Sequence, residues 1–228
     1  MSIAVSKSRR AFQAANATIL ILLALICVLP FVNVIAIAFS KSSYVSAGQV
    51  SFWPKGFTTA SFTYLIKRGT FWSSFCNSIV RCILGTSISL FLIVLTAYPL
   101  SKDNRALTGR TVYAWYFFFT MLINGGLIPT YIVITQLGLR DTIWALVIPG
   151  ALPVFYLVLM LNFFRQLPKE LEEAALIDGA GHFRTLVQIY LPVSLPSIAT
   201  IVLFCMVDDG NAWVDGTLYI NSPTKLPL

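Results

Sequence analysis

The chain has 228 residues, 57% of them hydrophobic and 11% charged, and carries a formal net charge of +7 at pH 7. Together with a mean hydropathy of +0.79, this composition excludes an ordinary soluble domain and predicts an integral membrane protein. The basic balance does not indicate a nucleic-acid partner, because polytopic membrane proteins gather Lys and Arg on their cytoplasmic side.

Five stretches that lack charged side chains are long enough to span a bilayer. A span needs roughly 20 apolar residues to cross about 30 Å of hydrocarbon. Stretches of that kind lie between Arg10 and Lys41, Arg81 and Lys102, Arg110 and Arg140, Asp141 and Arg165, and Arg184 and Asp208. We therefore expect an all-α, polytopic protein with five spans, at residues 17–39, 77–98, 111–136, 142–163 and 193–209, the third broken near Asn124-Gly125-Gly126.

The N-terminal stretch begins like a signal peptide, with Lys7, Arg9 and Arg10 ahead of an apolar run. That run is much longer than the roughly 7–15 apolar residues of a signal peptide, and four more hydrophobic segments follow it. It is therefore predicted to be an uncleaved first span. The whole chain, residues 1–228, is predicted to form a single transmembrane domain.

The cysteines are scattered in or beside apolar segments, without a CxxC pair and without a histidine at ligand spacing. Neither a disulfide framework nor a zinc site is predicted. We expect Cys27, Cys76, Cys82 and Cys205 to be small core residues.

Basic residues near the ends of the spans predict the orientation. One side receives nine of them, Lys7, Arg9, Arg10, Lys102, Arg105, Arg110, Arg165, Lys169 and Arg184, and the other receives six, Lys41, Lys55, Lys67, Arg68, Arg140 and Lys225. The excess predicts a cytoplasmic N-terminus by the positive-inside rule. The polar segment between the fourth and fifth spans is then also cytoplasmic.

Arg81 lies near the outer end of the second predicted span. A charged side chain at such a position either lines a polar path or extends to the lipid headgroups. For a long Arg one turn inside a helix, we expect the second arrangement.

The polar segment between the fourth and fifth spans predicts a short amphipathic helix outside the membrane. Pro168 suits a first helical turn, and the acidic residues after it oppose the positive end of the helix dipole. The positions that share one helix face are Leu167, Leu171, Ala174 and Ala175. Gly179 is placed to end the helix in the left-handed conformation, and Gly181 permits a second change of direction.

On composition alone, this segment is equally well an ordinary loop with solvated acids. Its spacing favours a more specific interpretation: Glu173-Ala174-Ala175, three residues, Gly179, nine residues, then Ile189-x-Leu191-Pro192. This resembles the EAA signature of ABC importer permeases, EAA-x3-G-x9-I-x-LP. The stretches "NGGLIPTYIVITQLGLRDTIWALVIPG", "FFRQLPKELEEAALIDGAG" and "LTAYPLSK" are similar to the carbohydrate-uptake permeases related to the maltose system, particularly the complex-oligosaccharide branch.

The resemblance implies the type I ABC importer permease fold and a bacterial inner-membrane location. It implies a second permease subunit, two ATP-binding subunits and an extracytoplasmic sugar-binding protein as partners, besides membrane lipids. The segment at about 165–192 would be the coupling loop, seated in a groove of the ATPase subunit. The residues carried over to that role are Glu173, Ala174, Ala175, Asp178, Gly179, Ile189, Leu191 and Pro192.

The chain departs from the family pattern in two places. The family has a sixth span after the fifth, so we expect the chain, which runs to "LYINSPTKLPL", to be part of a longer permease. Asp208 and Asp209 stand where relatives carry small or uncharged residues. With Asn211 and Trp213, these acids are candidate sugar contacts, but the favoured interpretation is that they mark the water-exposed end of the fifth span.

The sequence encodes no nucleotide site of its own, since the pattern G-x-x-x-x-G-K-[ST] is absent. We therefore expect a permease that is not an enzyme, binds no cofactor or metal, and moves a sugar with ATP hydrolysed by other subunits. The alternatives are an ABC permease for a non-sugar solute, such as a peptide or a phosphonate, and a membrane anchor that docks a cytoplasmic partner.

Overall fold

The structure is a computed structural model that describes residues 7–103 and 107–227. All of the secondary-structure elements within those residues are helices, which confirms the all-α prediction. The chain divides into two compact units, Met1–Gly69 and Thr70–Leu228. The candidate site lies entirely in the second unit.

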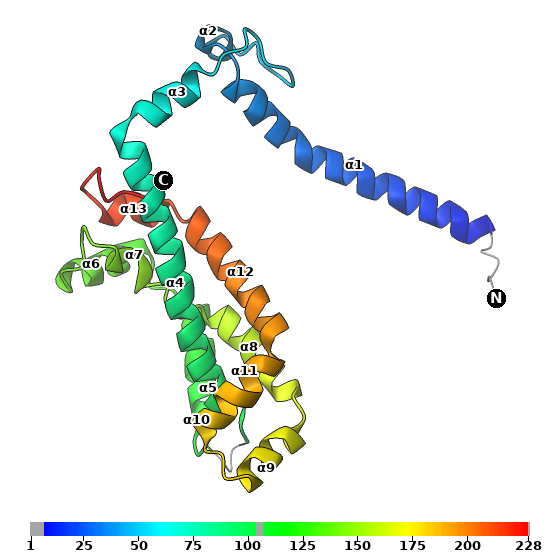
Figure 1. Cartoon of the computed structure of the whole chain (residues 1–228), viewed down its shortest axis with the longest axis vertical. Coiled ribbons are helices and arrows are strands. Elements are labelled where there is room, and N and C mark those ends of the chain that lie inside the picture. Colours follow the sequence, from blue (N-terminus) through cyan, green and yellow to red (C-terminus); the bar gives the residue numbers. More distant parts are fainter. Residues whose placement is uncertain (1–6, 104–106, 228) are drawn as a thin grey trace. The chain divides into compact units, whose positions relative to one another are not determined.

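The described part of the first unit contains one long helix and two short ones. Helix α1 (Lys7–Ala38) is followed by α2 (Ser42–Ser46) and α3 (Ala60–Lys67) (Figure 1). The apolar window of α1 is only 6% buried within the chain. A helix that is apolar on all sides and has so few protein neighbours is suited to contact with lipid.

The second unit is built around α4 (Gly69–Ser101) and α12 (Leu195–Asn211), which run side by side (Figure 1). The helix α8 (Val154–Gln166) packs against both. Their facing side chains form the main hydrophobic core, which includes Ile93, Ala97, Leu157, Met160 and Ile201. Each of these five side chains is at most 2% exposed.

The third predicted span is broken where the sequence suggested. Helices α5 (Arg110–Leu122) and α6 (Leu127–Gln136) are bent by 112° across the Asn124-Gly125-Gly126 break. The fourth predicted span, 142–163, is not one continuous helix. A short helix, α7 (Trp144–Val147), precedes α8, and the intervening Pro149, Gly150 and Pro153 interrupt the helix.

The remaining helices are short. After α8 come α9 (Lys169–Ile177), α10 (His182–Thr185), the π-helical turn η1 (Leu186–Tyr190), α11 (Leu191–Val193) and, after α12, α13 (Val214–Tyr219). Among the described residues, two helices are long and apolar enough to cross a membrane, or up to four if each of two bent pairs counts as one span. The shorter α8 is apolar as well. The count of five spans stays a prediction.

Two sequence-based interpretations of single residue types need correction. Of the cysteines, only Cys205 is buried, whereas Cys27 and Cys76 are exposed on apolar helices and Cys82 is intermediate. Arg81 does not extend to a headgroup region, because its side chain is only 3% exposed and forms an ion pair with Asp215. The carboxylate of Asp215, more than 130 residues later in the chain, stabilises the buried guanidinium by pairing with its charge.

Short helices lie at opposite ends of the second unit. Helices α9 and α10 are at one end, and α13 is at the other (Figure 1). The α9 end carries Lys102, Arg110, Arg165, Lys169 and Arg184. Arg105, which also contributed to the predicted charge asymmetry, lies outside the described residues.

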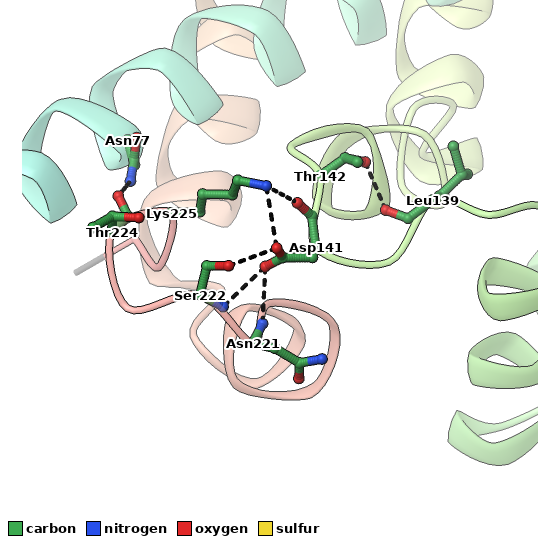
Figure 2. A network of polar contacts seen from close by, with 8 residues as sticks. All are labelled: Asn77, Leu139, Asp141, Thr142, Asn221, Ser222, Thr224 and Lys225. Atoms are coloured by element: carbon green, nitrogen blue, oxygen red, sulfur yellow. Dashed lines mark hydrogen bonds and ion pairs between the residues drawn. The ribbon is translucent and has the colours of Figure 1, made fainter.

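At the α13 end, Asp141 holds the C-terminal segment in place (Figure 2). Its carboxylate accepts hydrogen bonds from the backbone N–H of Asn221 at 3.1 Å and of Ser222 at 2.9 Å. The Ser222 hydroxyl donates at 2.6 Å, and Lys225 Nζ lies 3.1 Å from the same carboxylate. Asp141 also adopts a left-handed φ of 58°, which an Asp tolerates better than most residues. These bonds join the loop after α6 to the segment after α13.

Low pH should weaken the contacts between Asp141 and the segment after α13. Hydrogen bonds from Ser222, with Lys225 and Asn221, hold the pKa of Asp141 well below its usual range. Its stabilising contribution is therefore complete above the ordinary carboxyl pKa of about 4 and is lost as the pH falls through the lower folded-state value. We predict that amide protection of residues 219–222, measured by hydrogen exchange and corrected for intrinsic rates, falls in strong acid. In Asp141→Asn, protection should be weaker at pH 7 and should not show this acid-dependent loss; identical profiles for both proteins would contradict the assignment.

Candidate functional site

Helix α9 and the turn after it form the core of the candidate coupling segment. Pro168 is the residue before the helix rather than its first residue, and Glu170 and Glu172 lie in the first turn. The helix ends at Ile177, and Gly179 in the turn after it has a left-handed φ of +77°, as predicted. The N–H of Ala180 closes the turn on the carbonyl of Ala175 at 2.9 Å. Gly181 has an ordinary φ of −70°.

The two alanines of the EAA triplet have different environments. Ala175 is 5% exposed and faces the rest of the chain, whereas Ala174 is exposed. The predicted common face with Leu171 is therefore unevenly buried, since Leu171 is 39% exposed. Ile177 is 86% exposed. Helix α9 thus presents an apolar outer face, with Ala174 and Ile177 on it, that nothing in the described chain covers.

Glu172 connects α9 to the rest of the unit. Its carboxylate lies 2.8 Å from Lys102 Nζ, just after α4, and accepts a hydrogen bond from the Tyr190 hydroxyl of η1 at 3.0 Å. Lys102 Nζ also donates to the Tyr190 hydroxyl at 2.9 Å. We call Lys102, Glu172, Tyr190 and Tyr98 the Lys102 cluster. It joins three elements that are far apart in the sequence.

The Lys102 ammonium is almost completely buried. Its side chain is 9% exposed, and Nζ lies 4.0 Å from the centre of the Tyr98 ring. Burial lowers the pKa of Lys102, and the neighbouring Glu172 opposes that shift. The Tyr98 and Tyr190 rings meet edge to face at 5.0 Å, and Phe164 of α8 packs on Tyr190 at 5.4 Å. The charge is therefore held by a carboxylate, a hydroxyl and an aromatic face.

The end of the EAA signature continues this connection into α12. The segment containing α10 to α11 is bent by 82° relative to α12. Ile189 and Leu191 are half-buried against the main core. Pro192 follows the π-helical turn and lacks the N–H that a regular helix would use there. The connection from α9 to the core therefore runs through an irregular segment.

A cavity of about 370 Å³ lies away from the α9 end, between α4, α7, α8, α12 and α13. Arg81, Asp208, Asp209 and Asp215 line it. Arg81 Nη1 donates to the carbonyl of Ala212 at 2.5 Å and to Asp215 at 3.3 Å, and Nη2 forms the ion pair with Asp215. The acidic pair of α12 therefore lines a cavity, and Asp208 is also exposed, as expected for the end of the fifth span.

Asn211 and Trp213 line a second groove. It lies beside the break between α5 and α6, where Asn124, Gly126 and Thr130 are also exposed to it. The cavity and the groove share Ala212, Asp215 and Tyr219 in their walls. Of the four predicted sugar contacts, two therefore line the cavity and two line the adjoining groove.

Sequence reasoning missed several of these residues. Lys102 counted only as a basic residue at a span end, Glu172 was passed over in favour of Glu173, and Asp215 was not considered. The sequence held one usable signal for Lys102: it directly follows the uncharged stretch that ends at Ser101. Nothing in the sequence pairs it with Glu172 or pairs Arg81 with Asp215.

Comparison with known proteins agrees with this geometry. Residues 54–208 match the family described as "Binding-protein-dependent transport system inner membrane component". The chain belongs to this family. It is therefore a multi-pass membrane component of a transport system and a permease rather than an enzyme, and the resemblance to ABC importer permeases is confirmed.

Two relatives come from Bacillus subtilis (strain 168). The polygalacturonan/rhamnogalacturonan transport system permease protein YtcP is 40% identical over 209 residues, which cover 92% of this chain and 72% of YtcP. Protein LplC is 40% identical over 223 residues, which cover 98% of this chain and 75% of LplC. A crystal structure of a bacterial ABC transporter that imports the acidic polysaccharide alginate matches with a TM-score of 0.89 and 31% identity, over 100% of this chain and 80% of that chain.

The Lys102 cluster predicts different roles for two adjacent glutamates. Glu172→Ala leaves the buried Lys102 ammonium without its carboxylate and should lower the free energy of unfolding by about 1–3 kcal/mol. Glu173→Ala removes an exposed carboxylate and should change it by less than about 0.5 kcal/mol. Denaturant unfolding of the purified protein in detergent compares the two. Equal destabilisation by both substitutions would contradict the cluster.

Proposed function

We propose that this chain is a permease subunit of an ABC importer that moves a sugar or oligosaccharide across the bacterial inner membrane. The observation that carries the proposal is family membership combined with 40% identity to YtcP, which is named for polysaccharide transport. The whole transporter adds a second permease, two ATP-binding subunits and an extracytoplasmic sugar-binding protein. The ATP-binding subunits hydrolyse the ATP.

The interrupted helices support a translocation path through the second unit. Non-helical backbone at membrane depth is tolerated where it is buried in protein or lines a water-filled space. The break between α5 and α6 adjoins a groove that also exposes Asn211 and Trp213. Amide groups bond sugar hydroxyls, and an indole face stacks on a sugar ring. This groove and the adjoining cavity provide one half of the path.

The outer face of α9 receives the mechanical work. Ala174 and Ile177 present a small, apolar surface, and the Lys102 cluster ties the opposite side of the helix to α4 and η1. A partner that pushes on α9 would therefore move the ends of two helices of the path. Glu173, Asp178 and Gly179 complete the coupling segment, with Ile189, Leu191 and Pro192 as its link to α12.

The basic residues around α9 support a cytoplasmic position for this end. Lys102, Arg110, Arg165, Lys169 and Arg184 all lie there, against Arg140 and Lys225 near α13. Such an arrangement brings α9 to the side where ATP is available. The N-terminus is cytoplasmic as well in this proposal.

Two substitutions test the coupling role without touching a span. Gly179→Val forces a β-branched residue into the left-handed region, at a cost of about 1–3 kcal/mol, and should distort the turn. Ala174→Trp adds bulk to the outer face of α9. Both should preserve membrane insertion, but lower sugar uptake per ATP hydrolysed at least about tenfold or release the ATPase subunits.

The measurement is parallel uptake, hydrolysis and co-purification in proteoliposomes that contain all subunits. Gly181→Val is the matched control, because it changes a glycine of the same loop that has an ordinary φ and open space around it. Normal uptake, hydrolysis and co-purification in both Gly179→Val and Ala174→Trp would refute the coupling role. Uptake of peptides or phosphonates, with no sugar transported, would replace the sugar assignment.

A further inference from the structure

A pocket of about 400 Å³ lies at the α9 end of the second unit, walled by the end of α4, the start of α5, the end of α8 and helix α9. Its wall carries four cationic side chains and three carboxylates, from Lys102, Arg110, Arg165, Lys169, Asp103, Glu172 and Glu173. Lys102 forms an ion pair with Glu172 at 2.8 Å. Lys169 forms one with Asp103 at 2.8 Å. Two of the four positive charges are therefore matched inside the protein.

The other two positive charges, on Arg110 and Arg165, are not matched. Among the described residues, no ion pair joins either guanidinium to a carboxylate, and residues 104–106 contain no Asp or Glu. Burial lowers the pKa of Arg165, and the charge of Arg110 lowers it further, so the two guanidiniums are close enough to repel each other. Glu173, the carboxylate outside the two pairs, carries one charge and cannot balance both. An anion placed at the two guanidiniums would relieve the repulsion.

Backbone carbonyls at the end of α4 hold both guanidiniums at the pocket. Arg110 Nη1 donates to the carbonyl of Lys102 at 3.1 Å, and Arg165 Nη2 donates to the carbonyl of Leu100 at 3.3 Å. The end of a helix carries about half of a negative elementary charge, which is too little to neutralise two guanidiniums. Each guanidinium has five N–H donors, so donors remain for a ligand. Arg165 is exposed and Arg110 is half-buried, which leaves both accessible from outside.

The position and the apolar part of the pocket indicate the kind of anion. Arg110 directly precedes the third predicted span and Arg165 closely follows the fourth, so both belong at the level of the lipid headgroups. Phe164, Leu167 and Leu176 line the same pocket and favour a ligand that also has an apolar part. Basic pockets between membrane helices on the cytoplasmic side are typical sites for anionic lipid headgroups.

We propose that Arg110 and Arg165 bind the phosphate group of an anionic phospholipid from the cytoplasmic leaflet. Guanidiniums bind phosphate oxygens through paired N–H···O bonds, which are stronger than bonds between neutral groups. A free phosphate ester offers the same charged group but gains nothing from the apolar wall. The bound headgroup lies against Lys169 and thus beside α9. The inference uses the cytoplasmic position of α9 and does not depend on which solute is transported.

Three soluble probes separate the possible sources of the phosphate. Dioctanoylphosphatidylglycerol is an anionic lipid, dioctanoylphosphatidylcholine has the same tails with no net charge, and glycerol 3-phosphate lacks the tails. Native mass spectrometry of the delipidated complete transporter, titrated with each probe, measures the affinity of the tightest site. The wild type should bind the anionic lipid at least about tenfold more tightly than either other probe. In Arg110→Gln/Arg165→Gln that affinity should fall at least about tenfold, and each single variant should lose part of it.

Two further variants separate a built site from general attraction by positive charge. Arg184→Gln is the matched control, because Arg184 is a basic residue of the same end that bonds to Gln188 and lies outside the pocket; it should leave the affinity unchanged. Glu173→Gln removes the remaining negative charge from the wall and should raise the affinity about two- to fivefold. An unchanged affinity in the double variant, an equal loss in Arg184→Gln, or no gain in Glu173→Gln would overturn the site. Equally tight binding of glycerol 3-phosphate or of the uncharged lipid by the wild type would overturn the anionic lipid as its ligand.

Discussion

Burial of the Lys102 ammonium is the constraint on which the α9 end of this protein depends. An ammonium at 9% exposure is costly unless its charge is matched, and here Glu172, the Tyr190 hydroxyl and the Tyr98 ring all contribute. Since these groups come from α9, η1 and α4, the charge is satisfied only when the three elements meet. The position of α9 is thereby fixed from its inner side, which leaves Ala174 and Ile177 free on its outer side.

The second recurring constraint is the cost of irregular backbone among apolar helices. The break between α5 and α6 lies beside the groove, which Asn124 and Gly126 line. The break between α7 and α8 lies beside the cavity, which is lined by Pro149, Gly150 and Pro153. Gly and Pro interrupt helices locally, and polar walls or solvent satisfy the freed backbone groups. The same residues that shorten the helices therefore shape the space between them. Pairing of Arg81 with Asp215 closes one wall of that space.

Sequence reasoning succeeded where the physics is local. The left-handed Gly179, the helix before it and the break at Asn124-Gly125-Gly126 were all predicted, because each depends on a few adjacent residues. It failed for Arg81 and did not distinguish the exposed Ala174 from the buried Ala175. Arg81 was expected to seek headgroups because its partner Asp215 lies far along the chain, and the buried side of α9 depends on the elements it packs against. The interruption within residues 142–163 was not foreseen, because the high apolarity of this stretch outweighed Pro149, Gly150 and Pro153 in the interpretation.

The central claim is that the outer face of α9 contacts the ATPase subunit, and site-specific photo-crosslinking tests it directly. A photoreactive residue is placed at Ile177, which is 86% exposed on that face, or at Trp213, which is 67% exposed and lies near the opposite end. In the complete transporter, Ile177 should give an adduct with the ATPase subunit, and Trp213 should not. An ATPase adduct from Trp213, or none from Ile177 in an active transporter, would contradict the account.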